Sequence, residues 1–264
     1  MFVTEFLYKK QDKEKSVLIK EIIKKLIYRE KADSNSYVKY LRTIGVRIGD
    51  RTIIYAPTKT CIDTTRPWLI EIGNDVKITE GVTILTHGYD WSVLQNVYGE
   101  ILGSAGKVKI GNNVFIGMKT TILKGVEVGD NVIIGANSLV NKDIPSNVVV
   151  AGNPARVIMS IEEYYQKRKL VQEKEAMELV KEYRKVFNKN PEEKHLHEFF
   201  WLFSNGNDAI PECWKRMLFL GEDEMCTSKF KRNKKKYSDM ESFLKTVESQ
   251  NGKENMYIIN AKGQ

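Results

Sequence analysis

The sequence predicts a mainly β fold, a parallel β-helix, with an N-terminal helix and a C-terminal α-helical extension. Aliphatic residues recur every six positions between Lys107 and Pro145, and 14 of the 18 glycines fall between Gly45 and Gly152. One aliphatic side chain every six residues suits short flat strands that each send one branched residue into a shared core. The predicted inward residues are Ile110, Ile116, Ile122, Val128, Ile134 and Val140.

Glycine directly follows several of these inward residues, as at Gly111 and Gly117. Because glycine tolerates backbone angles that a Cβ forbids, we expect it to let the chain turn each corner tightly. Weaker members of the same repeat extend it towards the N-terminus. They are Ile48, Ile54, Ile72, Ile78 and Ile84, with an irregular coil expected between 54 and 72.

The repeat loses its phase between Ile84 and Ile110, which are 26 residues apart. Because 26 is not a multiple of six, residues 86–106 cannot all lie on the faces and are predicted to leave as a loop. Loops that a rigid scaffold extrudes are where binding and catalytic groups concentrate. This loop begins with Thr86 and His87.

Helical spacing predicts the two flanking segments. A helix over 16–31, capped by Ser16, suits either a membrane surface or the open end of the β-helix. In the tail, Ser160 and Glu163 form a capping box before a helix to Phe187. Further helices are expected over 192–203, 211–220 and 240–249, and the tail aromatics form its own core or a subunit contact. The predicted domains are 1–39, 40–159 and 160–264.

The 264 residues carry a net charge of +8, from 42 Lys and Arg against 34 Asp and Glu. This excess lacks a recognised nucleic-acid-binding motif, so we expect no nucleic-acid partner. No apolar segment is long enough for a membrane span, and three widely spaced cysteines suit a reducing compartment, which predicts a cytoplasmic protein. The basic run at 229–236 is interpreted as a solvated loop or as an anchor for an acidic polymer or anionic lipid.

The repeats, Thr86-His87 and the closing segment Gly152-Asn-Pro-Ala-Arg-Val-Ile158 resemble the hexapeptide-repeat acyltransferases. Among these, the chain is most similar to the acetyl-CoA-dependent sugar O-acetyltransferases, over residues 40–160. The resemblance implies a left-handed β-helix and a homotrimer with active sites between subunits. It also implies acetyl-CoA as co-substrate and a carbohydrate acceptor in surface polysaccharide, capsule or lipopolysaccharide. Such an enzyme can work at the inner face of the membrane, on a lipid-linked glycan.

Acyl transfer to a hydroxyl needs a base, and histidine has an unperturbed pKa near neutrality. Of three histidines, only His87 lies in the repeat domain, and it matches the family's catalytic histidine. We hypothesise that His87 deprotonates the acceptor, with Asp90 orienting its ring. Tyr89 and Trp91 are expected to shape the acceptor pocket or to pack the loop. Two further acceptor-side candidates are Asp63 and Arg66, which could equally hydrogen-bond a corner.

The resemblance also places acetyl-CoA along a groove between coils. Position by position, main-chain contacts would fall near Met118, Ala136 and Ser138. Lys142 and Arg156 stand where family members hold the CoA phosphates; otherwise they are ordinary surface charges. No metal is expected.

Other classes of function remain as alternatives. A zinc carbonic anhydrase on this fold needs three converging histidines, and the repeat domain has one. An O-acetyltransferase for an antibiotic or small molecule would differ from a sugar O-acetyltransferase mainly in the loop contacts to the acceptor, which the sequence does not specify. Amino-sugar N-acetylation often accompanies an N-terminal nucleotide-binding domain, for which the first 39 residues are too short. A β-helix that only scaffolds oligomerisation is the non-enzymatic alternative.

Overall fold

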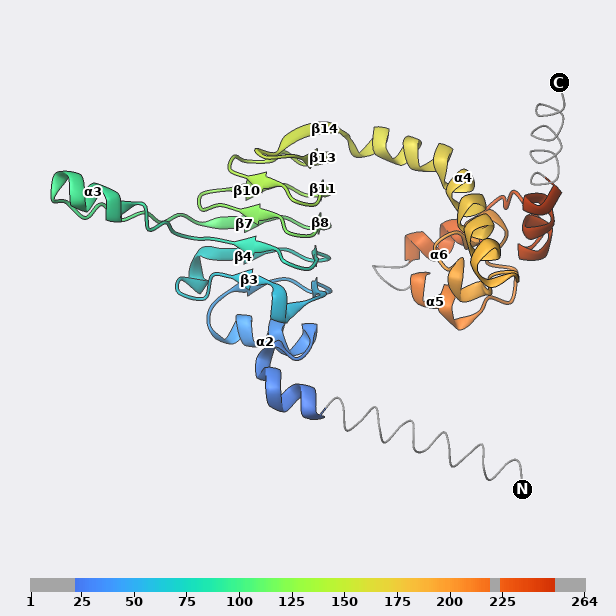
Figure 1. The fold of residues 1–264 in the computed structure, drawn as a ribbon, viewed down its shortest axis with the longest axis horizontal. Helices are drawn as coiled ribbons and strands as arrows, with labels where there is room; N and C mark the ends of the chain where they lie inside the picture. The colour runs from blue at the N-terminus through green and yellow to red at the C-terminus, as the bar shows by residue number, and fades with distance from the viewer. Residues whose placement is uncertain (1–21, 219–223, 250–264) are drawn as a thin grey trace. The chain divides into compact units, whose positions relative to one another are not determined.

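The computed structural model describes residues 22–218 and 224–249. The chain divides between Tyr164 and Tyr165 into two compact units, which are treated separately below. The first unit contains all the strands, and the second is helical (Figure 1). In the part of the chain that the structure describes, no helix has both the length and the apolar character needed to cross a bilayer.

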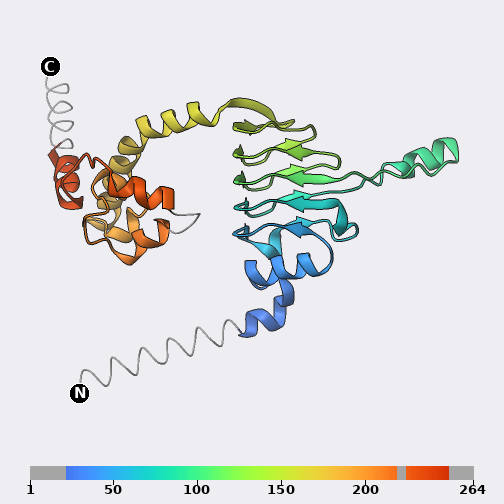
Figure 2. The same ribbon diagram turned by 180° about the vertical axis from the view of Figure 1, so that it is seen from behind.

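Three parallel sheets form the first unit, and the chain visits them in turn, so that successive coils stack on one another (Figures 1 and 2). This is the parallel β-helix that the six-residue repeat predicts. The first sheet contains β1 (Arg47–Ile48), β4 (Ile70–Ile72), β7 (Val108–Ile110) and β10 (Glu127–Val128). The second contains β2 (Ile53–Ile54), β5 (Lys77–Ile78), β8 (Val114–Ile116), β11 (Val132–Ile134) and β13 (Val148–Ala151), with β14 (Arg156–Ser160) antiparallel to β13. The third contains β3 (Cys61–Ile62), β6 (Thr83–Ile84), β9 (Thr121–Ile122) and β12 (Leu139–Val140).

The inward residues of successive coils stack in register along the core. Ile72 pairs with Ile110, and Ile110 pairs in turn with Val128. All six predicted inward residues are buried, with at most 1% of their surface exposed. Burying each such side chain is worth about 1.5–3 kcal/mol before the entropy of ordering the chain is subtracted. The repeat therefore marks the core correctly.

The role expected for the glycines that follow inward residues is wrong, because neither Gly111 nor Gly117 has a left-handed φ. The left-handed backbone angles fall on Asn113, Asn131 and Asn147, with φ of 53°, 57° and 63°. Their side chains form a ladder, since Asn113 Nδ2 donates to Asn131 Oδ1 and Asn131 Nδ2 to Asn147 Oδ1, both at 2.9 Å. Gly117 instead permits close stacking: a Cβ there would lie 2.5 Å from the backbone N of Ala136 in the next coil. At Gly117 glycine is therefore needed for the approach of two backbones, whereas Gly81 and Gly125, which do not follow an inward residue, do have left-handed φ values of 76° and 81°.

The N-terminal end of the β-helix is covered by α2 (Ser34–Thr43), which follows the short 3₁₀ helix η1 (Arg29–Lys31). Asp33 caps α2 by accepting from Ser36 N at 2.8 Å, and Tyr37 and Leu41 are buried in the β-helix core. The helix expected over 16–31 does not fill this role in its described part. Residues 22–28 are helical, but their apolar side chains are exposed, and Ser16 lies outside the described residues.

The predicted extruded segment at 86–106 is confirmed, although it is not a plain loop. His87 and Ala105 form an antiparallel bridge at its root, and α3 (Trp91–Tyr98) lies at its tip (Figure 1). We call residues 86–106 the arm. The irregular coil expected between 54 and 72 is also confirmed, with the 3₁₀ helices η2 (Pro57–Lys59) and η3 (Pro67–Leu69) at its corners.

The second unit is built on α4 (Ile161–Phe187), α5 (Glu212–Leu218), α6 (Glu224–Lys231) and a helical segment over 240–249. The predicted capping box is confirmed: Ser160 N donates to Glu163 Oε2 at 2.7 Å and Glu163 N to Ser160 Oγ at 3.1 Å. The aromatic side chains pack in the unit's own core, as predicted.

Two expectations for the second unit are wrong. Residues 192–203 form only the 3₁₀ helices η4 (Glu193–His195) and η5 (Phe200–Leu202). Buried aromatic contacts, such as the stacking of Phe200 on Trp214 at 5.5 Å, determine the path of the chain there instead of helical spacing. The basic run at 229–236 is not simply a loop, since it begins inside α6.

Candidate active site

The imidazole of His87 is paired with the carboxylate of Asp63 at the root of the arm. The distance from His87 Nδ1 to Asp63 Oδ2 is 2.6 Å, and the two side chains are 12% and 4% exposed. Asp63 follows β3 and His87 follows β6, which are hydrogen-bonded neighbours in the third sheet. Both residues therefore lie at the corner where the chain leaves this sheet, one coil apart.

Two threonines hold the Asp63 carboxylate in place. Thr65 donates to Asp63 Oδ1 through its backbone N at 2.9 Å and through its Oγ1 at 2.7 Å. Thr86 donates to Oδ2 through its backbone N at 3.1 Å and also through its hydroxyl. Burial alone would raise the pKa of Asp63, but the hydrogen bonds from Thr86, Thr65 and His87 outweigh it and lower that pKa well below its ordinary value. The carboxylate is ionised at neutral pH.

An ionised carboxylate at Nδ1 fixes the tautomer of the histidine. Because Asp63 Oδ2 can only accept, Nδ1 carries a proton, so in the neutral imidazole the lone pair lies on Nε2. This is the arrangement of a general base whose ring is oriented by a carboxylate. The Tyr89 ring stands edge-on to His87 with the centroids 5.1 Å apart, and Trp91 lies 5.9 Å beyond it.

Asp90 and Asp63 do not have the roles in the site that the sequence suggested. Asp90 is the residue before α3 and its side chain makes no capping hydrogen bond, while the Nδ1 partner of His87 is Asp63. The expectation that Asp90 orients the ring is therefore wrong. Asp63 is buried with both oxygens occupied, so it does not face an acceptor. Arg66 is joined to this cluster through Thr65, with 3.5 Å between Arg66 Nη1 and Thr65 Oγ1.

Met118 and Ala136 occupy equivalent exposed corners of successive coils, between the second and third sheets. Within the described residues, the backbone N–H groups of both lack a hydrogen-bond partner. Unpaired donors stacked one coil apart suit main-chain contact with an extended amide-containing arm such as that of CoA. In one chain this corner is not the one that carries His87.

Ser138 differs from its two predicted companions because it is buried. Its Oγ donates to Gly135 O at 2.6 Å and accepts from Gly152 N at 3.2 Å. Its carbonyl accepts from Thr121 N at 2.9 Å. The side chain therefore stabilises the corner, and a main-chain contact of Ser138 with the cofactor stays a prediction.

Lys142 and Arg156 are both exposed. Lys142 lies after β12 at the same type of corner as His87, and Arg156 begins β14. Across the described ranges, neither side chain has a carboxylate within ion-pair distance, and Arg156 Nη1 donates to Ala155 O at 2.8 Å. Both are available to an anion. Among residues 22–218 and 224–249, no cluster of His, Cys, Asp or Glu could hold a metal ion.

Sequence reasoning missed Thr65 and Thr86 as parts of the site. Thr86 is fully buried and Thr65 sits two residues after Asp63. The available signal was the polar run Asp63-Thr64-Thr65 in an otherwise aliphatic frame, facing Thr86-His87 one coil later.

The fold is a parallel β-helix that holds a carboxylate-oriented histidine at the root of an extruded arm. The family described as bacterial transferase hexapeptide (six repeats) matches residues 107–142. Protein CapG of Staphylococcus aureus is 40% identical over 146 residues, which cover 55% of this chain and 81% of CapG. The chain belongs to the hexapeptide-repeat acyltransferase family and is an enzyme.

Two further relatives share shorter segments. The galactoside O-acetyltransferase of Escherichia coli (strain K12) is 42% identical over 94 residues, 36% of this chain and 45% of that protein. The solved structure of a hexapeptide-repeat acetyltransferase from Vibrio cholerae, complexed with acetyl coenzyme A, is 30% identical with a TM-score of 0.38. It covers 44% of this chain and 60% of that one. The chain thus spans less than half of the galactoside enzyme.

Proposed function

We propose that this enzyme transfers an acetyl group from acetyl-CoA to a hydroxyl of a sugar, in the synthesis of a surface polysaccharide. The observation that carries the proposal is the 2.6 Å pair between Asp63 and His87, which presents a histidine Nε2 lone pair at the root of the arm. Sugar acceptors are supported by the likeness to the galactoside O-acetyltransferase.

In the proposed reaction, His87 Nε2 takes the proton of the sugar hydroxyl as its oxygen attacks the thioester carbonyl carbon. The new C–O bond forms, the C–S bond breaks, and the thiolate leaving group takes up the proton that His87 holds. The fixed negative charge of Asp63 stabilises the imidazolium that exists between these steps. No acyl-enzyme is needed.

The co-substrate supplies the activated acetyl group. Its amide-containing arm would meet the free backbone donors at Met118 and Ala136, and its phosphates would meet Lys142 and Arg156. Charge-assisted contacts of this kind bind phosphate more strongly than neutral hydrogen bonds do. Tyr89, Trp91 and Arg66 would surround the acceptor.

The proposal extends to the assembly. In one chain, the corner with Met118 lies on a different edge of the β-helix from His87. A left-handed β-helix that forms a homotrimer would bring the two types of corner together between neighbouring subunits, which completes the site. We place the enzyme in the cytoplasm, with access to the inner face of the membrane.

The direct test is release of free CoA thiol from acetyl-CoA by the purified protein, measured against a panel of acceptors. The panel contains neutral and acidic sugars, amino sugars and an aminoglycoside. Thiol release that depends on a sugar hydroxyl supports the proposal. Release with the amino sugars or the antibiotic alone would assign a different acceptor, and no release with any acceptor would contradict the proposal. Mass spectrometry of surface glycans from cells with and without the protein then identifies the natural acceptor.

A further inference from the structure

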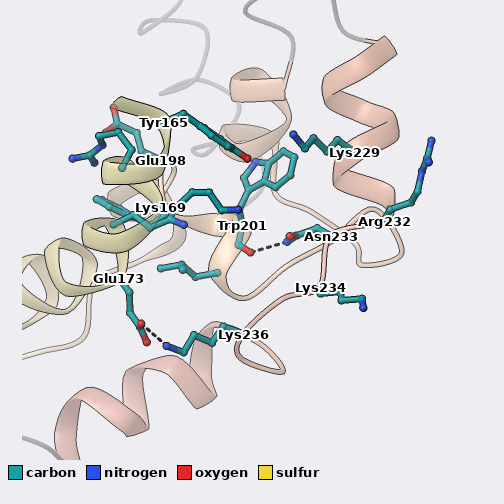
Figure 3. A pocket seen from close by; sticks show the side chains of 14 residues that line it. Tyr165, Lys169, Glu173, Glu198, Trp201, Lys229, Arg232, Asn233, Lys234 and Lys236 are labelled. Carbon is teal, nitrogen blue, oxygen red and sulfur yellow. Dashed lines mark hydrogen bonds and ion pairs between the residues drawn. The ribbon is translucent and has the colours of Figure 1, made fainter. Parts of the chain in front are cut away.

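The second unit contains a groove that the proposed reaction does not use. Its volume is about 840 Å³, and its walls come from α4, the η5 region and the chain from α6 to Lys236 (Figure 3). Volumes of this size are typical of sites for small ligands or a few residues of a polymer. All of the lining residues belong to the second unit.

The groove is strongly basic. Six of its 14 lining residues are Lys or Arg, against two Glu. Glu173 is neutralised by Lys236 at 2.5 Å, as Figure 3 shows, and Arg168 pairs with Glu175 at 2.6 Å.

The remaining cations lack compensation. Throughout the described part of the chain, Lys169, Lys229 and Lys234 have no carboxylate within ion-pair distance, and Arg232 donates to Ser228 Oγ at 2.7 Å. Like charges gathered around a concave surface raise the local positive potential and attract an anion.

Aromatic rings lie among these cations. Tyr165 is 41% exposed, and its ring centroid is 5.3 Å from Lys169 Nζ and 5.6 Å from Lys229 Nζ. Trp201 is half-buried and packs on Phe230 with the centroids 5.0 Å apart. Its carbonyl oxygen accepts from Asn233 Nδ2 at 2.7 Å. The ring of Trp201 and the backbone of Trp201 are thus each supported by a neighbour from another wall of the groove.

We propose that this groove binds an anionic glycan, the acidic form of the acceptor polymer. The flat C–H faces of sugar rings stack on aromatic side chains, while carboxylate or phosphate groups on the glycan meet the unpaired lysines. A bilayer is flat and cannot enter a concave site of this kind. A nucleic acid would use the same cations, but its bases are not acceptors of the proposed acetyl transfer.

This inference rests on the proposed function for the identity of the ligand, since a sugar acceptor is what the first unit requires. A polymer held by the second unit raises the effective concentration of its own hydroxyls at the first unit of the same chain. The groove should therefore matter for long acidic acceptors and not for short neutral ones.

The test measures binding to the full chain at physiological ionic strength, by isothermal titration calorimetry. The acidic probes are a hyaluronan fragment, which carries carboxylates, and a teichoic acid fragment, which carries phosphates. A chitin fragment of the same length is the neutral probe, and polyphosphate supplies charge without sugar. We expect both acidic glycans to bind more tightly than the chitin fragment, and the tighter of the two identifies the anionic group. Equal binding of the chitin and acidic fragments would overturn the proposal.

Variants separate charge from stacking. K229Q/K234Q should weaken binding of the hyaluronan fragment by about tenfold or more, because charge-assisted hydrogen bonds are lost. K167Q/K174Q removes two exposed lysines of α4 outside the groove and should have little effect. Tyr165→Leu should weaken glycan binding by roughly fivefold and leave polyphosphate binding unchanged. The assignment would be overturned if K229Q/K234Q and K167Q/K174Q weakened binding of the hyaluronan fragment equally. It would also be overturned if RNA or phosphatidylglycerol vesicles bound more tightly than the acidic glycans and Tyr165→Leu had no effect on glycan binding.

Acetyl transfer to a short neutral sugar keeps the two proposals distinct. If acetyl transfer persists but substitutions in the groove do not change the binding of acidic glycans, the groove proposal is wrong and the proposed function stands. If the groove binds acidic glycans specifically but no sugar is acetylated, the proposed function is wrong and glycan binding by the groove stands.

Discussion

The carboxylate of Asp63 and the imidazole of His87 come from consecutive coils of the β-helix and meet at 2.6 Å. The residues are 24 positions apart in sequence, and the parallel pairing of β3 with β6 brings them to one corner. Because both strands are fixed in the core, the pair is held without dependence on the tip of the arm. Several measurable consequences arise from this arrangement.

Replacing His87 by Ala removes the proposed base. Turnover should fall by roughly 10²–10⁴-fold, the usual worth of general base catalysis. Binding of CoA should stay nearly unchanged, because its proposed contacts lie elsewhere. Thiol release and calorimetric CoA binding measure the two effects, and turnover close to that of the wild type would contradict the assignment.

Replacing Asp63 by Asn should lower kcat with little change in the KM for acetyl-CoA. An amide cannot accept from Thr65, Thr86 and His87 at both positions, so the ring loses its fixed tautomer. Asp90→Asn serves as the matched control, since Asp90 does not contact the ring in the described structure. Equal losses in both variants would show that nearby negative charge, and not ring orientation, matters.

The difference in folding stability between the wild type and Asp63→Asn should depend on pH. Hydrogen bonds lower the pKa of Asp63 in the folded state, so its ionised form stabilises the fold above the unfolded pKa of about 3.9. This contribution is lost as the pH falls through the lower, folded value. The urea midpoint of the wild type should therefore be higher than that of Asp63→Asn, and the difference should be largest at neutral pH. This difference should shrink below about pH 4. A margin that grows on acidification would contradict the direction of the shift.

Removing both Lys142 and Arg156 should raise the KM for acetyl-CoA by about tenfold, since two exposed, solvent-screened charge contacts are together worth roughly 1–2 kcal/mol. The kcat should change far less, because neither side chain reaches the reacting atoms in the proposed mechanism. K167A/K174A in α4 controls for net charge. An unchanged KM would identify Lys142 and Arg156 as ordinary surface charges.

Gly117→Ala should destabilise the β-helix by about 1–3 kcal/mol, because the added Cβ would overpack two stacked coils. That Cβ would lie 2.5 Å from the backbone N of Ala136, which cannot move without shifting the next coil. Gly103→Ala in the arm is the matched control, since its Cβ would meet no atom within 4 Å. Thermal unfolding followed by circular dichroism distinguishes the two, and similar melting temperatures would show that the coils can separate at little cost.

The core could be predicted from sequence because each coil repeats the same physical demand. Each coil needs one aliphatic inward residue every six positions, so the sequence repeats with the same period as the fold. Ile116 and Ile134 are buried at the positions that this spacing predicts. The arm could be predicted because 26 residues break the period. Both inferences need only the order of residues along the chain.

The partner of His87 could not be predicted in the same way. Asp63 lies in the irregular coil between 54 and 72, where η2 and η3 lengthen the corners and the frame is lost. The polar run Asp63-Thr64-Thr65 is visible in the sequence, but without the register Ile62↔Ile84 it cannot be assigned to face His87. Nearness in sequence favours Asp90, whereas the actual partner, Asp63, is near only in space.

The arm interrupts the chain but not the stacking of the coils. Ile84 before it pairs with Ile122, and Ile72 pairs with Ile110 after it, as though residues 86–106 were absent. Changes in the length or sequence of the arm beyond its root therefore leave every inward contact intact. Evolution can therefore diversify the arm, and with it the proposed acceptor contacts, without risk to the folding of the β-helix.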